Sequence, residues 1–469
     1  MLSSIKPNFW RFASVSPSPD MSTNSFILDR SKCISCGLCV KACKNIAGQS
    51  VLKLEKDTAY KGKRVSTVSG HLLQNTNCIK CGMCTLVCPT AALAEKDITH
   101  EVESILKNPG NMITTVQTAP ASRVVIAEAF GLPPGTVVTG KLVTALKMLG
   151  FKYVFDTNWG ADMTIVEEAT ELVNRIKSNS KNLPMFTSCC PAWINYVEES
   201  QPDLIPNIST CKSCLAMLAA TLRKDFAALN HIRPENIYHV AIMPCIAKKD
   251  EIERPQLRTQ SGLKETDAVV TVRELIRWLK REKIDLKKLP DTPFDKFYGE
   301  STGASTIFCN TGGVMEAAIR TAYKFYTGHE MKNYDVKAVR GTEGIRYAAV
   351  DFDGMPVHFA VANGTAQAMK LIKRIKSKDP EVANIKFIEV MACPGGCVMG
   401  GGTNKAKNKK VLQKRTDAIY KVDEEKEERA SHFNKEVNQC YDRSYDGQYF
   451  GHLAHESLHT HCKPQNYKV

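Results

Sequence analysis

Two adjacent cysteines, Cys189 and Cys190, stand in the segment Thr-Ser-Cys-Cys-Pro-Ala-Trp at residues 187–193. Neighbouring side chains do not easily reach the geometry of a disulfide bond. The pair therefore indicates two thiols with separate tasks. A thiol with a pKa of about 8.5 can donate a proton and be refilled near neutral pH. A thiolate can also bind a metal.

Three apolar segments of the chain end in cysteine, and each reads as a short buried strand. They are residues 183–186 before Cys189 and Cys190, residues 239–244 before Cys245, and residues 387–392 before Cys393 and Cys397. Open α/β sheets bind ligands just beyond the carboxyl ends of their strands. The pattern therefore predicts a metal centre collected from separate loops.

A cysteine motif, C-x-x-C-x-x-C-x-x-x-C, occurs twice within residues 30–95. Its members are Cys33, Cys36, Cys39 and Cys43, then Cys78, Cys81, Cys84 and Cys88. This is the spacing of bacterial-type ferredoxins, in which each fourth cysteine ligates the other 4Fe–4S cluster. The expected sets are Cys33, Cys36, Cys39 with Cys88, and Cys78, Cys81, Cys84 with Cys43. Zinc is the competing metal, but its sites typically use separated C-x-x-C pairs. Two clusters in one small module indicate electron transport.

The composition is that of a soluble globular protein of 469 residues, long enough for two or three domains. Most of its 18 cysteines lie in the patterns just described, which favours metal ligation over disulfides and requires a reducing compartment. The sequence contains no run of ~18 apolar residues, so no membrane span is predicted. The formal charge of +14 serves solubility or attracts an acidic partner. No recognition motif supports nucleic-acid binding.

The expected fold is an α+β ferredoxin-like two-cluster module followed by an α/β domain with parallel sheets flanked by helices. Residues 96–112 read as a connector between them. A capping box at Thr164 and Glu167 predicts the start of a helix. Glu168, Glu171 and Arg175 would line one edge of that helix. Taken alone, Glu171 and Arg175 are typical of an ordinary surface pair.

Four segments follow from these patterns. Residues 1–22 resemble an organellar presequence, basic and rich in serine, although a merely disordered start has the same composition. Residues 23–98 form the ferredoxin-like domain and residues 110–404 the active-site domain. Residues 405–469 form a tail with histidines between His452 and His461, where scattered surface histidines are favoured over a metal site.

Three motifs in order, TSCCPAW, MPCIAKK (243–249) and EVMACPGGCVMGGG (389–402), resemble the signature segments of FeFe-hydrogenases. The resemblance extends from the double cysteine motif to the C-terminal AHESLHTH. It implies reversible reduction of protons to dihydrogen at a six-iron H-cluster, with electrons relayed through the two 4Fe–4S clusters. It also implies an acidic ferredoxin as electron partner and separate maturation enzymes for cofactor insertion. With the presequence, it suggests a hydrogenosome or a related organelle.

The resemblance assigns site residues one by one. Cys190, Cys245, Cys393 and Cys397 would hold a 4Fe–4S cube, with Cys397 bridging to a two-iron subcluster that bears CO, cyanide and azadithiolate. Lys248 resembles the lysine that hydrogen-bonds one cyanide, and Ala119 and Pro120 resemble the loop at the other. Residues packed around the two-iron unit would be Met243, Pro244, Phe308 and Met391. Cys189 resembles the thiol that passes protons, and the path behind it would be Ser209, Glu168, Glu171 and Arg175.

The chain departs from the family pattern at Ala192, Cys214, Leu215, Cys309 and Thr403-Asn404. Family members usually carry glycine in place of Ala192 and of Cys309, and proline in place of Cys214. They usually carry Gln or His in place of Leu215, and Gln-Pro in place of Thr403-Asn404. Leu215 is expected to touch the two-iron pocket. Because the ligands and both relay carboxylates remain, we expect an active enzyme with a modified pocket.

Two other classes of protein share parts of this pattern. Hydrogenase-like iron–sulfur assembly scaffolds share the three motifs, but they usually lack the first cysteine of the pair and the complete double motif. A plain electron carrier would not need the full set of cube ligands. Cys189 and the eight N-terminal cysteines favour the hydrogenase. The absence of a nucleotide-binding glycine loop argues against direct use of NAD(P)H.

Overall fold

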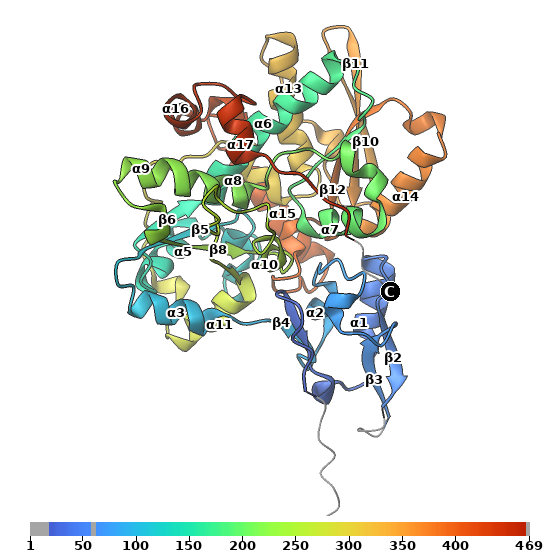
Figure 1. The fold of residues 1–469 in the computed structure, drawn as a ribbon, viewed down its shortest axis with the longest axis vertical. Coiled ribbons are helices and arrows are strands. Elements are labelled where there is room, and N and C mark those ends of the chain that lie inside the picture. Colours follow the sequence, from blue (N-terminus) through green and yellow to red (C-terminus); the bar gives the residue numbers. More distant parts are fainter. Residues whose placement is uncertain (1–17, 58–61, 466–469) are drawn as a thin grey trace, which may run out of the picture.

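The computed structural model describes residues 18–57 and 62–465. Most of the segment expected to be a presequence therefore lies outside the described residues. Figure 1 shows a small N-terminal module, drawn in blue, beside a larger body that contains two separate sheets. The fold class expected from the sequence, a ferredoxin-like module followed by an α/β domain, is confirmed.

The N-terminal module consists of two antiparallel strand pairs and two short helices. Its elements are β1 (Phe26–Leu28), β4 (Leu93–Glu95), β2 (Leu52–Lys56), β3 (Lys63–Thr67), α1 (Leu38–Lys41) and α2 (Met83–Val87). Each helix follows a glycine in the left-handed region, Gly37 at φ 71° and Gly82 at φ 74°. Glycine adopts this conformation without steric penalty, so the chain can turn tightly between the second and third cysteines of each motif.

The connector between the two parts is not merely a loop, because it contains α3 (Thr99–Lys107). Its apolar residues Val102 and Leu106 are buried in the core of the first sheet. The acidic and polar composition concealed this short amphipathic helix. Residues 96–112 thus connect the two parts through a short helix that was not expected from the sequence.

The first sheet of the large body is wholly parallel, with strand order β6-β5-β8-β9. Its strands are β5 (Ile113–Thr118), β6 (Tyr153–Asp156), β8 (Ile237–Met243) and β9 (Ala268–Thr271). Helices α5 (Thr139–Met148) and α11 (Val272–Arg281) contribute to the apolar core that covers it. The strands β5 and β8 carry Ala119 and Cys245 just past their carboxyl ends.

The second sheet has the order β10-β11-β12-β7, and only its first pair is antiparallel. Its strands are β7 (Met185–Phe186), β10 (Ile345–Phe352), β11 (Met355–Asn363) and β12 (Ile385–Met391). The neighbouring helices are α7 (Pro191–Ser200), α13 (Gly313–Thr327) and α14 (Thr365–Lys376). Each of the three strands expected to end in cysteine is present: β7, β8 and β12.

Helix α6 (Thr157–Lys177) lies between the cores of the two sheets. Ile165, Ala169 and Leu172 pack in the core of the second sheet, and Trp159 and Met163 pack in the core against α8 (Cys214–Thr221). Burial on both sides forces its polar residues into internal contacts. Figure 1 shows α6 beside α13 in the upper half of the molecule.

The start of α6 differs from the sequence prediction. Asp156 ends β6 and caps the helix directly, since its carboxylate accepts from the amide of Asn158 at 2.9 Å. Thr164 lies within the helix and donates to the carbonyl of Gly160 at 2.8 Å. The capping box at Thr164 and Glu167 was therefore wrong. Thr164 bonds within the helix and Glu167 bonds to groups outside it, so the two residues do not cap one another.

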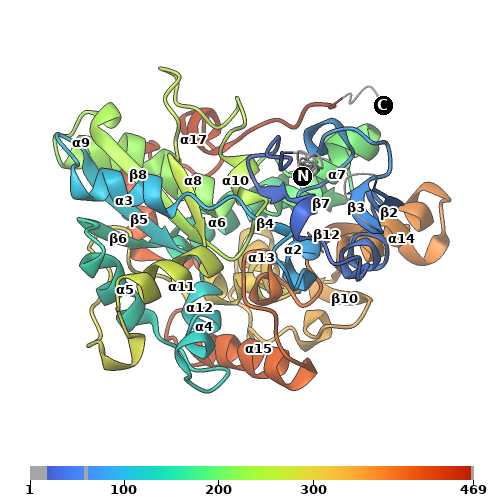
Figure 2. The same cartoon turned by 90° about the horizontal axis from the view of Figure 1, so that it is seen from below.

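The C-terminal segment forms α15 (Lys409–Glu424), α16 (Lys435–Ser444) and α17 (His452–Leu458). After α17 the chain crosses the body towards α7, as the dark red trace in Figure 1 shows. There the amide of Lys463 donates to Glu198 on α7 at 3.0 Å. Seen from below in Figure 2, α15 lies on the side of the body away from α17. Among the described helices, none is long and apolar enough to cross a membrane.

Candidate metal centres and proton path

The eight N-terminal cysteines form two groups in space, and each group lines its own cavity. Cys33, Cys36, Cys39 and Cys88 line one, and Cys43, Cys78, Cys81 and Cys84 line the other. The fourth cysteine of each motif thus joins the other motif's set, as the spacing predicts. Backbone amides point at several of the sulfurs. The amide of Val51, for example, lies 3.3 Å from the Cys43 sulfur.

The third group lies where β7, β8 and β12 end. One cavity is lined by every residue expected to hold or enclose the active-site cofactor: Ala119, Pro120, Cys190, Met243, Pro244, Cys245, Lys248, Phe308, Met391, Cys393 and Cys397. Cys189 lines it as well. Cys190 also caps α7, with Pro191 in the first turn. A helix N-terminus stabilises negative charge, but burial outweighs it and raises the pKa of the Cys190 thiol.

None of these cysteine sets fits a single zinc ion. A tetrahedral zinc ion with Zn–S bonds of about 2.3 Å holds its sulfurs about 3.8 Å apart. Among the residues that the structure describes, just one group of three or more potential ligands has its donor atoms within 4.8 Å of one another. It contains none of the twelve predicted cysteine ligands. Their wider spacing fits polynuclear groups.

The second cysteine set of the module adjoins the active-site cavity. Gly401 leaves no room for a Cβ because the carbonyl of Cys81 lies against it, and Gly82 packs on Ile246. The Thr85 hydroxyl contacts the Gly401 carbonyl at 3.4 Å. The run Gly400-Gly-Gly402 therefore lets the two parts approach closely. Electrons can pass between groups held on either side of this junction.

Behind Cys189 runs a row of buried polar side chains. The Ser209 hydroxyl donates to Glu171 Oε2 at 2.9 Å, and Arg175 Nη2 donates to Glu171 Oε1 at 2.6 Å. Arg175 also donates to the carbonyl of Ile208 at 2.9 Å, and its side chain is 13% exposed. The row therefore leads outwards to a side chain at the protein surface. Because Glu171 is buried, its pair with Arg175 is not an ordinary ion pair on the surface.

Glu168 lies in this row with both carboxylate oxygens buried. Burial raises the pKa of Glu168 to about 8, and the charge of Glu171 adds to the rise. The Ser209 hydroxyl and the Ser188 amide oppose it. Burial, followed by the charge of Glu168, also raises the pKa of the Cys189 thiol well above its usual range. Both groups therefore hold a proton at neutral pH.

The comparisons with known proteins agree with this geometry. The family model for the C-terminal domain of the iron-only hydrogenase large subunit matches residues 112–401. The iron hydrogenase small subunit model matches residues 409–465, and a 4Fe-4S dicluster domain matches residues 32–92. The chain belongs to the iron-only hydrogenase family.

The relatives of this chain include hydrogenases and iron–sulfur cluster assembly factors. Iron hydrogenase 1 of Clostridium pasteurianum is 42% identical over 95% of this chain and 77% of its own length. The solved structure of HydA1 from Chlamydomonas reinhardtii is 38% identical, with a TM-score of 0.69 over 78% of this chain and 99% of that one. The cytosolic Fe-S cluster assembly factor narfl of Xenopus tropicalis is 31% identical over 70% of each chain.

The cofactors of this hydrogenase are two 4Fe–4S clusters and an H-cluster. The residues present fit these groups, since three cavities gather thiols at distances too wide for one ion. Burial raises the pKa of Cys245 to about 12 and that of Cys393 well above its usual range. Ionised thiolates at these positions therefore require the positive charge of bound metal.

Lys248 supplies a fixed positive charge at the edge of the cavity. It donates to the Cys189 carbonyl at 3.2 Å and pairs with Glu251 at 2.7 Å. Burial opposes its charge, but Glu251 beside it raises the pKa of Lys248 above its usual range. The side chain is therefore a cation that can donate to an anionic ligand in the cavity.

Of the positions that depart from the family pattern, Cys214 and Cys309 line the cavity. Leu215 does not line it, contrary to the prediction, and packs behind Ala119 and Met243 instead. Ala192 lies in the first turn of α7 and is buried in the core. The altered chemistry at the cavity wall thus consists of two thiols.

Sequence reasoning missed the buried partners of α6 in the C-terminal segment. His459 is buried, whereas His452, His455 and His461 are exposed, so the prediction of surface histidines was wrong for His459. Its Nε2 lies 2.9 Å from Glu167 Oε2. Helical spacing gives no signal for this contact, because α17 ends at Leu458 and His459 follows it with extended backbone.

Proposed function

We propose that the chain catalyses the reversible reduction of protons to dihydrogen, with ferredoxin as its electron partner. One observation carries this proposal. An acidic row leads from the surface to a thiol, Cys189, on the wall of the cavity that also presents four cluster-binding cysteines. An assembly scaffold has no use for a buried proton path at that cavity.

The proton steps follow from the groups in the row. Glu171, held by Arg175, takes up a proton at the edge of the protein and exchanges it through the Ser209 hydroxyl. Glu168 carries its proton at neutral pH and passes it to Cys189, which presents it to the cavity. Groups arranged in this way act as general acids and bases when their pKa values lie near the working pH.

The remaining cavity residues hold and enclose the cofactor. Cys190, Cys245, Cys393 and Cys397 hold its cube, Lys248 donates to an anionic ligand, and the apolar wall excludes water. The wall consists of Ala119, Pro120, Met243, Pro244, Phe308 and Met391. When bound, the H-cluster supplies the redox chemistry that joins two protons and two electrons.

Electrons enter through the N-terminal module. Cys36 lies at the surface, and the set that contains Cys81 adjoins the active-site cavity at Gly401. This order suits transfer from an external carrier, through the first and second clusters, to the cavity. An acidic ferredoxin suits the excess of positive charge.

An infrared spectrum of the anaerobically matured protein tests the proposal. A hydrogenase shows the stretching bands of metal-bound CO and cyanide, whereas a scaffold carries only iron–sulfur clusters. A known hydrogenase that is matured under the same conditions serves as the positive control. A full complement of 4Fe–4S clusters without CO and cyanide bands would overturn the proposal in favour of the assembly scaffold.

We further propose a hydrogenosome or a related organelle as the location, with maturation enzymes as partners there. The basic, serine-rich segment at residues 1–22 supports this. Imaging of the full chain and of a chain without these residues tests it. Unchanged import of the shortened chain would remove the argument.

A further inference from the structure

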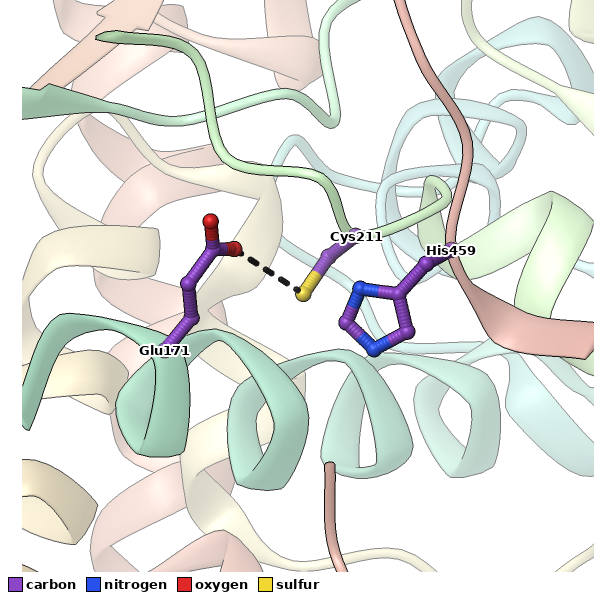
Figure 3. Close-up of side chains that lie close together, drawn as sticks. All are labelled: Glu171, Cys211 and His459. Carbon is purple, nitrogen blue, oxygen red and sulfur yellow. Dashed lines mark hydrogen bonds between the residues drawn. The ribbon is translucent and has the colours of Figure 1, made fainter. Parts of the chain in front are cut away.

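Three side chains of different chemistry converge at the outer part of the proton path. Glu171, Cys211 and His459 each present a potential ligand atom, and these atoms lie within 4.8 Å of one another. All three residues are buried. Figure 3 shows Glu171 on α6 facing Cys211 and His459, which come from the loop before α8 and the segment after α17. Within residues 18–57 and 62–465, no other such group of three is as compact.

The imidazole of His459 is already oriented as a metal ligand requires. Its Nε2 faces Glu167 Oε2 at 2.9 Å, and the Glu167 carboxylate also accepts from Tyr441 and from the amide of Phe450. Because Glu167 acts as an acceptor, Nε2 carries the proton and Nδ1 presents its lone pair. In Figure 3 the nitrogen nearer to the Cys211 sulfur is Nδ1. Metal-binding histidines are commonly held by a carboxylate in this way.

The other two donors are also close to the positions that zinc needs. The Cys211 sulfur lies 3.9 Å from Glu171 Oε2. A tetrahedral zinc ion holds a sulfur and a carboxylate oxygen about 3.5 Å apart, given its bond lengths to each. Arg175 holds the opposite oxygen, Oε1, at 2.6 Å. Oε2 is the oxygen that faces the sulfur, and zinc would compete there with the Ser209 hydroxyl at 2.9 Å and the Thr210 amide at 3.0 Å. Small side-chain rotations therefore complete the site.

A cavity of about 30 Å³ adjoins the site on the side of Cys211. It is lined by Ser209 and Cys211 on the inside and by Thr460, His461 and Cys462 towards the exposed end of the chain. This volume holds a water molecule. A zinc ion with three protein ligands commonly takes water as its fourth. The cavity thus supplies a place for that water beside Cys211.

We propose that Glu171, Cys211 and His459 form a binding site for a zinc ion, and that zinc bound there blocks proton delivery. The second half rests on the proposed role of Glu171 in the proton path. Zinc would replace the thiol proton of Cys211, which leaves as H⁺, and no electron is transferred. Thr210 would give up the hydrogen bond of 2.8 Å that joins its hydroxyl to Nδ1.

The balance of protons makes binding dependent on pH. Zinc binds the thiolate form of cysteine, not the thiol. Binding must therefore expel a proton that the empty site retains, so zinc affinity increases as the pH rises.

The test is a zinc titration of the anaerobic holoenzyme with zinc chloride. Dihydrogen evolution from reduced methyl viologen measures turnover, and zinc K-edge X-ray absorption measures the ligands without interference from iron. We expect one zinc ion per chain, with a single sulfur at about 2.3 Å and nitrogen and oxygen at about 2.0–2.2 Å. Turnover should decrease on the order of tenfold or more, because a relay carboxylate is removed.

Cys211→Ala and His459→Gln should resist inhibition, with the turnover of each variant in zinc compared with its own turnover without zinc. The matched controls are Cys440→Ala, another buried thiol, and His461→Gln, an exposed histidine. Both should bind zinc and be inhibited as the unaltered chain is. Zinc without a sulfur ligand would overturn the site and leave the hydrogenase proposal untouched. Zinc with the expected ligands but full turnover would overturn the block and argue against Glu171 as a relay.

Discussion

The thiols of the N-terminal module and those of the active-site cavity hold the same kind of metal group in opposite settings. In the module, each set comes from two short motifs, and Cys36 lies at the surface. In the cavity, the ligands come from three strand ends, and Cys189 joins them on the wall. A buried row of acids leads to the second site.

This difference separates the paths of electrons and protons. Electron transfer needs closely spaced clusters but no hydrogen-bonded path, so a compact module with an exposed edge suffices. Proton transfer needs donors within hydrogen-bond reach of one another. Helix α6 provides them because it is buried between two sheets and turns Glu168 and Glu171 inwards.

The largest expected effect separates the two kinds of site directly. Cys245→Ala removes a cube ligand, so we expect loss of the active-site cluster and of all turnover, with both ferredoxin clusters retained. Iron content, electron paramagnetic resonance and dihydrogen evolution measure this. Cys309→Ala is the matched control, since Cys309 lines the same cavity without an assigned ligand role. Undiminished turnover in Cys245→Ala would show that the ligand assignment is wrong.

The next largest effect concerns the proton side of the cavity alone. Cys189→Ser should retain every cluster yet reduce turnover by about 10²–10⁴-fold, the range that a positioned general acid contributes. A serine hydroxyl is a much weaker acid than a thiol, although it is similar in shape. Iron content and dihydrogen evolution of the same preparation provide the measurement. A wild-type rate would refute the proton role of Cys189.

Much of this comparison is accessible from the sequence, and its limits have physical causes. Ligand spacing identifies the cysteine sets because a cluster fixes which short separations are possible. Apolar runs identify β7, β8 and β12 because buried strands need them. The sequence does not reveal that Glu167 turns towards His459, because that contact joins segments 292 residues apart. The helix start at Asp156 was missed because a strand end and a helix cap coincide there.

Glu171→Gln tests whether burial distinguishes a relay from an ordinary ion pair. We expect a decrease in turnover of about 10²-fold, because the amide cannot take up a proton. Glu103→Gln is the matched control: Glu103 pairs with Lys107 at the same i, i+4 spacing and at 2.6 Å, but on the surface. It should change turnover by less than the error of a dihydrogen assay. Equal rates in both variants would return Glu171 to the role of a structural ion pair.

The pH dependence gives a smaller but more specific effect. The pKa of Glu168 is raised to about 8, so its carboxyl group is protonated below that pH and can donate. The proton is lost as the pH rises through about 8, and delivery should slow there. Hydrogen–deuterium exchange into dihydrogen measures this step without an electron donor. Glu168→Gln should give a lower rate without the step near pH 8, and an unchanged profile would contradict the assignment.

The smallest expected effect concerns the electron side. The chain carries a formal charge of +14, and an acidic ferredoxin should be drawn to it. Raising the salt concentration shortens the Debye length to ~10 Å at 0.1 M, so reduction by ferredoxin should slow a few-fold. Methyl viologen, a small cation, should not be slowed, and it serves as the control donor. If salt leaves the rate with ferredoxin unchanged while turnover with viologen is normal, charge attraction plays no part in electron delivery. The cavity and its proton path would then stand unaffected, because neither depends on the charge of the outer surface.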